Sequence, residues 1–305
     1  MNLDLMRGKN YGVEHLLASQ CSSLVEVLKT QLGLSPERVQ FLLSLGSIYV
    51  NGERCLENVQ TRQGNYLRVH QNPRRFPVEQ FRWPEQKVFE TEDLLVINKP
   101  CGLPVHPTVD NIQENLAALL SRQLACEIHV THRLDVATSG LLMFAKNKAA
   151  QSRINQMLML GETQKFYRAL VHGTNLPEGE WLHYMEPSKR APKNVSTTAH
   201  SGWAACRLRV LDQTEIFRGH SEVVIELITG RTHQIRAQLA TTGFPIVGDR
   251  AYGSPVQLAE HEEICLQAFY LSFPLLAGEN EKKSLRLPQA PWTSASPSRS
   301  LETLS

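Results

Sequence analysis

The sequence predicts an α+β fold built around a mixed, largely antiparallel β-sheet with a few flanking helices. Strand-like segments outnumber helix-like ones along the chain. The two kinds do not alternate strictly, as they would in a parallel α/β fold. In addition, the dipeptide Asn51-Gly52 stands between two strand-like runs, which is a signal for an antiparallel hairpin.

The composition is that of an ordinary globular chain. Its 305 residues suffice for one large domain or two unequal ones, with 42% hydrophobic residues, 20% charged residues and a formal net charge of +2. No segment resembles a membrane span or a secretory signal, so we expect a cytoplasmic protein. The 6 cysteines are scattered without CxxC pairs or Cys/His ligand spacing, which predicts no structural metal.

The N-terminal part predicts a small α/β domain at residues 21–70, preceded by an extension at residues 1–20. Apolar residues at helical spacing, a Pro at a helix start and Gly at both helix ends define two helices. The predicted elements are helices from Leu24 to Gly33 and from Ser35 to Gly46, and strands at 48–50 and 66–69.

A linker rich in Pro and Arg at residues 71–85 leads to a larger domain at residues 86–277. Residues 278–305 are dominated by Ser, Pro and charge and are expected to be a disordered tail. The elements predicted for the larger domain are strands at 88–89, 94–97, 141–145, 166–171 and 222–229, and helices at 147–160 and 231–242.

Two motifs of this larger domain indicate chemistry. HRLDVATSG at residues 132–140 places Asp135 before a Thr-Ser-Gly turn. A carboxylate there either caps turn amides or is a reacting group held still by short side chains. GRTHQIR at residues 230–236 offers cations that could keep such a carboxylate ionised.

Three further motifs accompany them: INKPCGLPVHP at residues 97–107, KFYRALVHG at 165–173 and GFPIVGDRAYG at 243–253. In order and approximate spacing, the five motifs resemble the RluA-type family of RNA pseudouridine synthases. The resemblance implies a catalytic domain with a central active-site cleft that needs no cofactor and no metal. It also implies a structured RNA substrate, either ribosomal or transfer RNA, bound by a monomer.

The resemblance assigns roles to three residues. Asp135 is expected to be the nucleophile, Arg236 to form an ion pair with it, and Tyr167 to stack on the target uracil. The resemblance also implies that Lys99 belongs to a loop that shapes the cleft and is not a catalytic lysine. Among the residues themselves, Arg231 is a rival to Arg236. Whether the carboxylate attacks the base at C6, attacks the ribose at C1′ or acts as a base on the sugar stays open.

Further RNA contacts are expected near Asp135. The resemblance implies that Arg133 fills the space left by the extruded base and contacts phosphate, with a salt bridge inside the loop as the alternative. Arg231, His132 and Thr138 are the other candidates for RNA binding or base flipping.

The order of two helices followed by a hairpin resembles an S4-type RNA-binding module. Arg62, Arg68, Arg74 and Arg75 follow the hairpin turn and could form a patch that faces phosphate. The second helix departs from the basic character of such modules, because it offers only Arg38. The alternative is a packing domain that never touches RNA.

These observations favour an RNA pseudouridine synthase of the RluA type. The alternative is a catalytically silent RNA-binding or assembly factor that retains the fold, but Asp135, Tyr167 and Arg236 are all present. A hydrolase that pairs Asp135 with His233 ranks last, because the sequence has no GxSxG-type nucleophile and no metal-ligand set.

Overall fold

The computed structural model describes residues 12–188, 191–217, 219–256, 263–275, 281–288, 290 and 292. The chain divides into two compact units. Unit 1 comprises residues 1–81 and 106–124, and unit 2 comprises residues 82–105 and 125–305. Residues 106–124 therefore group with the N-terminal module, whereas the sequence-based boundaries placed them in the larger domain at residues 86–277.

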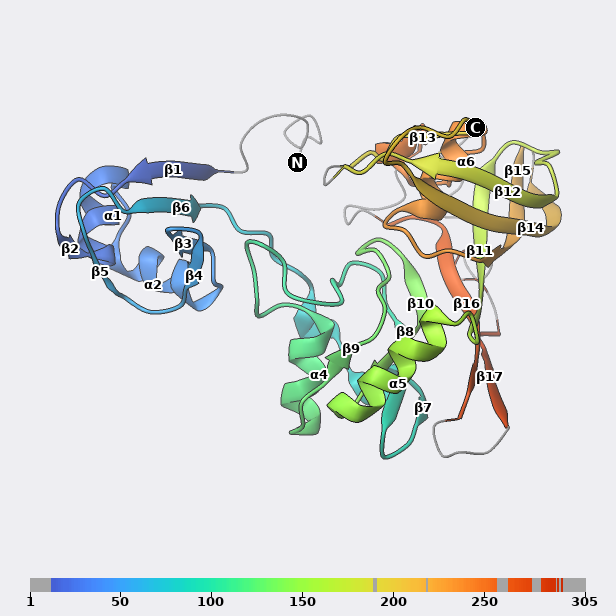
Figure 1. Cartoon of the computed structure of the whole chain (residues 1–305), viewed down its shortest axis with the longest axis horizontal. Helices are drawn as coiled ribbons and strands as arrows, with labels where there is room; N and C mark the ends of the chain where they lie inside the picture. The colour runs from blue at the N-terminus through green and yellow to red at the C-terminus, as the bar shows by residue number, and fades with distance from the viewer. Residues whose placement is uncertain are drawn as a thin grey trace. The chain divides into compact units, whose positions relative to one another are not determined.

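Unit 1 contains a four-stranded antiparallel sheet with the strand order β1-β6-β3-β4 (Figure 1). Its elements are β1 Val13–Leu17, β2 Ser22–Ser23, α1 Leu24–Leu32, α2 Pro36–Ser44, β3 Ile48–Val50, β4 Glu53–Cys55, β5 Gln60–Thr61, β6 Tyr66–His70, the 3₁₀ turn Val78–Gln80 and α4 Leu116–Leu124. The apolar faces of α1 and α2 pack with the sheet in one core. The two helices lie close to their predicted positions, and unit 1 also contains β1 and α4, which lie outside the predicted residues 21–70.

Local signals set the helix and turn boundaries of unit 1. Ser23 and Ser35 cap α1 and α2, each accepting a hydrogen bond from the backbone N–H three residues ahead. Gly33 ends α1 in the left-handed conformation, with φ 66°. In the predicted hairpin, Asn51 and Gly52 both have positive φ, 51° and 87°, as a type I′ turn requires.

Two strands lie outside the predicted domains. Strand β1 lies in the segment expected to be an extension, and β17 (Lys282–Arg286) lies in the segment expected to be a disordered tail. Both have largely exposed side chains and each pairs with a single neighbouring strand. Such strands carry little apolar alternation, because backbone pairing stabilises them more than burial does.

Unit 2 is built on an 11-stranded sheet with the main order β13-β12-β14-β15-β11-β16-β10-β8-β7. Strand β17 adds to β16, and β9 adds to β10. The β10–β16 pair is parallel and the other pairs are antiparallel, so the prediction of a mixed, largely antiparallel sheet is confirmed. The elements are α3 Trp83–Gln86, β7 Lys87–Glu90, β8 Leu94–Lys99, β9 His129–Val130, β10 Ser139–Ala145, α5 Lys148–Met159, β11 Gln164–His172, β12 Gly179–Met185, β13 Val195–Ser196, β14 Ala204–Phe217, β15 His220–Leu227, α6 Gln234–Thr241, the 3₁₀ turn Arg250–Tyr252, β16 Leu266–Pro274 and β17.

The two longer helices of unit 2 lie near different parts of this sheet (Figure 1). Helix α5 packs Ala150, Ile154 and Met157 into the core formed by β8, β10 and β16. Asn147, the first residue of the helix predicted at 147–160, caps α5 by accepting a hydrogen bond from the Ala150 N–H. Helix α6 packs near β12, β13 and β14, and its residues from Gln234 to Leu239 are all buried.

Helix α6 begins three residues later than predicted. The prediction started at Arg231, but the helix starts at Gln234, because His233 adopts a left-handed backbone with φ 60° and ψ 20°. No helix in the described part of the chain is long and apolar enough to cross a membrane.

Candidate active site

Asp135 lies in the loop that leads into β10. Lys99, the last residue of β8, stabilises this loop through hydrogen bonds from its side chain to the loop backbone. The Lys99 side chain is fully buried, and its Nζ donates to the carbonyl oxygens of Pro100 (2.9 Å), Val136 (3.1 Å) and Thr138 (2.8 Å). Burial lowers the pKa of Lys99 to about 8, so the group is still largely an ammonium at neutral pH, with three donors for three acceptors. Lys99 therefore fixes the backbone that directly follows Asp135 and ties it to the end of β8.

The start of β10, directly after the Asp135 loop, requires Gly140. Its φ is +116°, and a Cβ atom there would lie 2.3 Å from the Ala268 carbonyl oxygen of β16. Tyr167 on the neighbouring strand β11 pairs with the same Ala268, directly after a β-bulge. Thus β16 brings the Asp135 loop and Tyr167 together from its two sides, and the bulge sets the direction of the tyrosine.

Tyr167 is 5% exposed. Burial raises the pKa of its phenol, and the nearby Asp135 carboxylate raises it further, so the hydroxyl is protonated at neutral pH.

Arg236 on α6 lies between two carboxylates. Its Nη1 donates to Asp135 Oδ2 at 3.1 Å, while Nε and Nη2 donate to the two oxygens of Asp249 at 2.7 and 2.9 Å. Burial alone would lower the pKa of Arg236, but hydrogen bonds and charge from Asp249 and Asp135 raise it. The guanidinium therefore remains charged although its side chain is only 9% exposed.

Asp135 itself keeps access to solvent, with 21% of its side chain exposed. A partly accessible carboxylate beside a buried cation is anchored on one side and available to a reactant on the other. The expected juxtaposition of Asp135 and Arg236 is present, whereas the rival Arg231 has an exposed side chain and contributes its backbone N–H to Gln234 Oε1.

The other candidates of the Asp135 loop differ in how far they are exposed. Arg133 is exposed and its Nη2 lies 3.5 Å from Thr232 Oγ1, so it links the two motifs. His132 accepts a hydrogen bond from the Met143 N–H on Nε2, and burial lowers its pKa to about 3. A neutral imidazole in this role packs the loop.

Thr138 is a correction to the expected RNA contacts. Its residue is 2% exposed and its backbone carbonyl accepts from Lys99, so its side chain has no surface to offer RNA. Its backbone N–H donates to the Asp135 carbonyl oxygen at 3.1 Å, so Thr138 belongs to the turn that follows Asp135.

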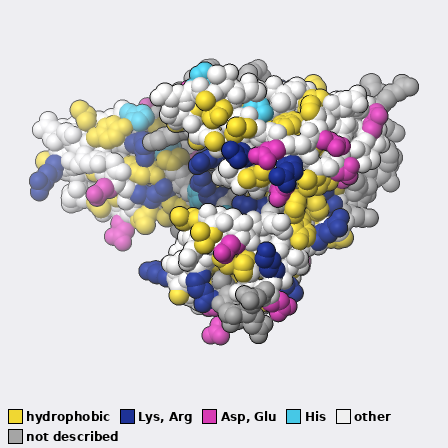
Figure 2. Space-filling view, turned by 45° about the vertical axis from the view of Figure 1, so that its right-hand side comes forward, with side chains coloured by type: hydrophobic (Ala, Val, Ile, Leu, Met, Phe, Trp, Pro, Cys, Tyr) yellow, Lys and Arg dark blue, Asp and Glu magenta, His cyan; other side chains and the backbone are white. Residues whose placement is uncertain are grey.

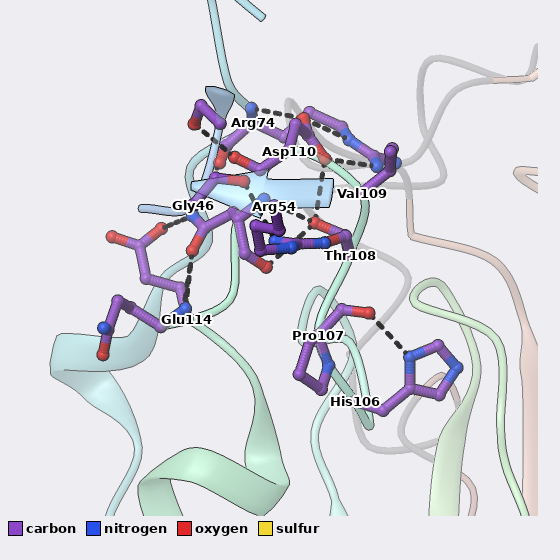
Figure 3. Close-up of polar contacts among 12 residues, drawn as sticks. Gly46, Arg54, Arg74, His106, Pro107, Thr108, Val109, Asp110 and Glu114 are labelled. Carbon is purple, nitrogen blue, oxygen red and sulfur yellow. Dashed lines mark hydrogen bonds and ion pairs between the residues drawn. The ribbon is translucent and has the colours of Figure 1, made fainter. Parts of the chain in front are cut away.

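Two of the four arginines expected to face RNA form ion pairs inside unit 1, and Figure 3 shows the one between Arg74 and Asp110. Arg74 makes three hydrogen bonds to the Asp110 carboxylate, from its backbone N–H, Nε and Nη2. Arg75 Nε donates to Glu114 Oε1 at 2.7 Å. Asp110 and Glu114 are each only 6% exposed, so these ion pairs are anchored in buried carboxylates. The pairs connect residues 106–124 to the N-terminal module, and they offset the positive charge that was expected to face RNA.

The same attachment involves Arg54, which no motif in the sequence singles out. Its guanidinium donates to the carbonyl oxygens of Gly46 and Thr108, both at 3.0 Å (Figure 3). Arg62 remains exposed, and the Arg68 guanidinium lies 3.9 Å from the centre of the Tyr49 ring. These two residues remain candidates for RNA contact.

Sequence reasoning missed Asp249. It lies in the GFPIVGDRAYG segment, which was noticed only for its resemblance. An aspartate after Gly248 looks like a turn residue, and no local signal indicates that it would be 1% exposed and paired with a helix residue from another segment. Among the described residues, no three His, Cys, Asp or Glu side chains are grouped so that they could hold a metal ion.

Comparison with known proteins connects this geometry to a family. The family model described as RNA pseudouridylate synthase matches residues 93–241, which include Asp135, Tyr167 and Arg236. Among curated relatives, the RNA pseudouridine synthase YlyB of Bacillus subtilis, described as uncharacterized, is 31% identical over 80% of this chain and 82% of its own length.

A plant relative and a solved human structure extend the comparison. The chloroplastic RNA pseudouridine synthase 6 of Arabidopsis thaliana is 36% identical over 67% of this chain, but the match spans 48% of that relative's length. The structure of human RNA pseudouridylate synthase domain containing 1 superposes with a TM-score of 0.51 and 26% identity, covering 67% of this chain and 83% of the human one.

Proposed function

Because the chain belongs to the RNA pseudouridylate synthase family, of the RluA type, we propose that it isomerises specific uridines of a structured RNA to pseudouridine. The observation that carries the proposal is the Asp135 carboxylate, partly exposed and 3.1 Å from a buried guanidinium. An anchored carboxylate with one accessible side suits a reacting group better than a turn cap.

The reaction needs no other reactant. The N1–C1′ bond of uridine breaks, a C5–C1′ bond forms, C5 loses its proton and N1 gains one. The chain must therefore supply a nucleophile or base, hold the detached uracil and keep water away. We assign the first role to Asp135, whether it attacks C6 or C1′ or takes a proton from the sugar, with Arg236 keeping it ionised.

Tyr167 is proposed to contact the uracil beside Asp135. Its convergence with the Asp135 loop on Ala268 and its protonated phenol support this role, since the ring offers an aromatic contact and the hydroxyl a donor. Arg133 is proposed to contact the RNA where the base leaves the stack, because it is exposed and lies only two residues before Asp135.

RNA binding beyond the target base needs positive surface rather than a high net charge. Figure 2 shows several Lys and Arg side chains near the middle of the face that it draws. In unit 1, which we propose to be an S4-type module, Arg62 and Arg68 are the residues proposed to face phosphate, in preference to the ion-paired Arg74 and Arg75.

The central test replaces Asp135 by Asn. Uridine isomerisation is expected to disappear, while RNA affinity changes only a few-fold, because the change removes the charge and preserves the shape. Pseudouridines are mapped in total RNA from cells that lack the protein and are complemented with either form. Asp212→Asn, the same change at an exposed position of β14, is the control. Retained turnover in Asp135→Asn would remove this residue from the mechanism.

The same maps identify the RNA. Sites that vanish without the protein and return with it define the substrate as ribosomal or transfer RNA. The cytoplasmic location and the monomeric state expected from the sequence remain predictions, which fractionation and light scattering address.

The proposed role of unit 1 is tested with Arg62→Gln and Arg68→Gln. Each lost phosphate contact should reduce the slope of log affinity against log salt concentration by about 1. Lys29→Gln changes one exposed charge on α1 of the same unit and is the control. Unchanged slopes in both arginine variants would favour a packing role for the module.

A further inference from the structure

Besides Nη1 of Arg236, an imidazole nitrogen of His233 lies near the carboxylate of Asp135. His233 precedes α6, and its Nε2 lies 3.8 Å from Asp135 Oδ2. The backbone of His233 is left-handed, with φ 60°, a conformation that residues with a Cβ atom adopt rarely and at a cost. The strained backbone directs an imidazole towards the proposed reacting group.

The opposite nitrogen of this imidazole is occupied by Tyr252. His233 Nδ1 lies 3.0 Å from the Tyr252 hydroxyl, and the same hydroxyl accepts a hydrogen bond from the Lys193 backbone N–H at 2.8 Å. A backbone N–H can only donate, so the single phenol proton is available for His233 Nδ1. Nδ1 is then an acceptor, and the imidazole proton resides on Nε2, facing Asp135.

The charge states fit this arrangement. Burial raises the pKa of Tyr252 to about 12, so the phenol keeps its proton. Burial also lowers the pKa of His233, although Asp135 and Asp249 act in the opposite direction and Arg236 and Lys193 in the same direction. A neutral imidazole has one N–H, and Tyr252 determines which nitrogen carries it.

We propose that His233, held by Tyr252 in the Nε2–H form, is a positioning residue that fixes the Asp135 carboxylate together with Arg236. This inference rests on the proposed function. Both donors approach the same oxygen, Oδ2, from Arg236 Nη1 at 3.1 Å and from His233 Nε2 at 3.8 Å. Among the described residues none donates to Oδ1, which is thereby assigned as the oxygen that reacts with the nucleoside.

The distance of 3.8 Å exceeds a hydrogen bond in the structure without RNA. Hydrogen bonds at catalytic centres are often long without substrate and shorten when it binds. We expect the distance between His233 Nε2 and Asp135 Oδ2 to shorten in the same way when RNA binds.

Two variants separate the parts of the arrangement. His233→Asn removes the imidazole but keeps a residue that tolerates the left-handed backbone. Tyr252→Phe removes the hydroxyl but keeps the ring whose centre lies 4.9 Å from the Arg236 guanidinium. His200→Asn changes an exposed histidine of the same unit and is the control.

We expect kcat for isomerisation to fall about ten-fold or more in His233→Asn and less in Tyr252→Phe, with RNA affinity unchanged, because a misoriented carboxylate slows the reaction without weakening binding. Imidazole nitrogen spectra of the wild-type protein should show Nδ1 unprotonated and Nε2 protonated, and Tyr252→Phe should mix the two tautomers. A His233→Asn variant with wild-type kcat, or a wild-type spectrum with protonated Nδ1, would overturn the inference. The spectra are read without RNA, so they judge the Tyr252–His233 arrangement even if the wild-type chain isomerises no uridine and the proposed function fails.

Discussion

Arg236 is bound more extensively by Asp249 than by Asp135. Two hydrogen bonds of 2.7 and 2.9 Å join it to Asp249, and one of 3.1 Å joins it to Asp135. Asp249 is the more buried carboxylate, with a side chain 1% exposed against 21% for Asp135. Asp249 therefore fixes the guanidinium, and the guanidinium in turn fixes the proposed reacting group.

Replacement of Asp249 by Asn should destabilise the protein and impair turnover. Removing one partner of a buried ion pair leaves an uncompensated charge and costs about 3–5 kcal/mol. Urea unfolding measures this loss, and kcat reports the displaced guanidinium. Glu226→Gln breaks the more exposed pair with Arg209, which should cost only about 0–1 kcal/mol. Equal stability of the two variants would show that Asp249 does not hold Arg236 in place.

Replacement of Lys99 by Met should disturb the Asp135 loop. The chain length is kept, but the carbonyl oxygens of Pro100, Val136 and Thr138 lose their shared donor. Buried acceptors without partners cost about 1–3 kcal/mol each where no alternative donor replaces the lost one, and kcat should fall while RNA affinity persists. Lys148→Met on the exposed start of α5 is the matched control. Normal kcat in Lys99→Met would mean that the turn holds Asp135 without the lysine.

A structural feature of this protein can be predicted from the sequence when neighbouring residues in the chain determine it. The caps Ser23, Ser35 and Asn147 and the Asn51-Gly52 turn were predictable, because each acts on backbone groups within a few residues. Strands β1 and β17 were not, because pairing with one neighbour leaves no apolar pattern.

The site shows the same division. Asp135 and Arg236 were expected together because of a family resemblance, since residues so far apart in the chain carry no local signal of contact. The roles of Asp249 and of Asp110 depend on which segments the fold brings together. Asp110 neutralises Arg74, which the sequence alone presented as a free positive charge beside the hairpin.

The stability of the protein should depend on His132 in mildly acidic solution. Burial lowers the pKa of His132 to about 3 from the ordinary 6.5, so between these values the unfolded chain binds the proton and the folded chain does not. This contribution to stability is complete above pH 6.5 and is lost as the pH falls towards 3, by up to about 1.4 kcal/mol per pH unit.

This dependence is measured by the unfolding free energies of the wild type and of His132→Gln between roughly pH 7 and pH 4. Over this range the unfolded wild-type chain takes up the His132 proton and the folded chain largely does not. Glutamine can still accept from the Met143 N–H but does not titrate, so its profile should be flatter. Parallel profiles would show that His132 titrates in the folded protein as it does in the unfolded chain.

Gly140 should tolerate no side chain. A Cβ atom at this position would lie 2.3 Å from the carbonyl oxygen and 2.6 Å from the nitrogen of Ala268, and both are backbone atoms of a central strand. They cannot move aside without breaking the pairing of β16 with β10 and β11, on which the Asp135 loop and Tyr167 converge. Gly140→Ala should therefore lose soluble yield or, if it folds, melt far below the wild type and lose activity.

Gly179→Ala separates this clash from the backbone cost. Gly179 has a similar φ of +104°, but nothing lies within 4 Å of its virtual Cβ, so only the conformational term of about 1–3 kcal/mol applies. The difference between the two melting temperatures measures the contact with Ala268. If both variants melt together, β16 yields to a methyl group, and the close approach of β10 and β16 is not what positions the Asp135 loop opposite Tyr167.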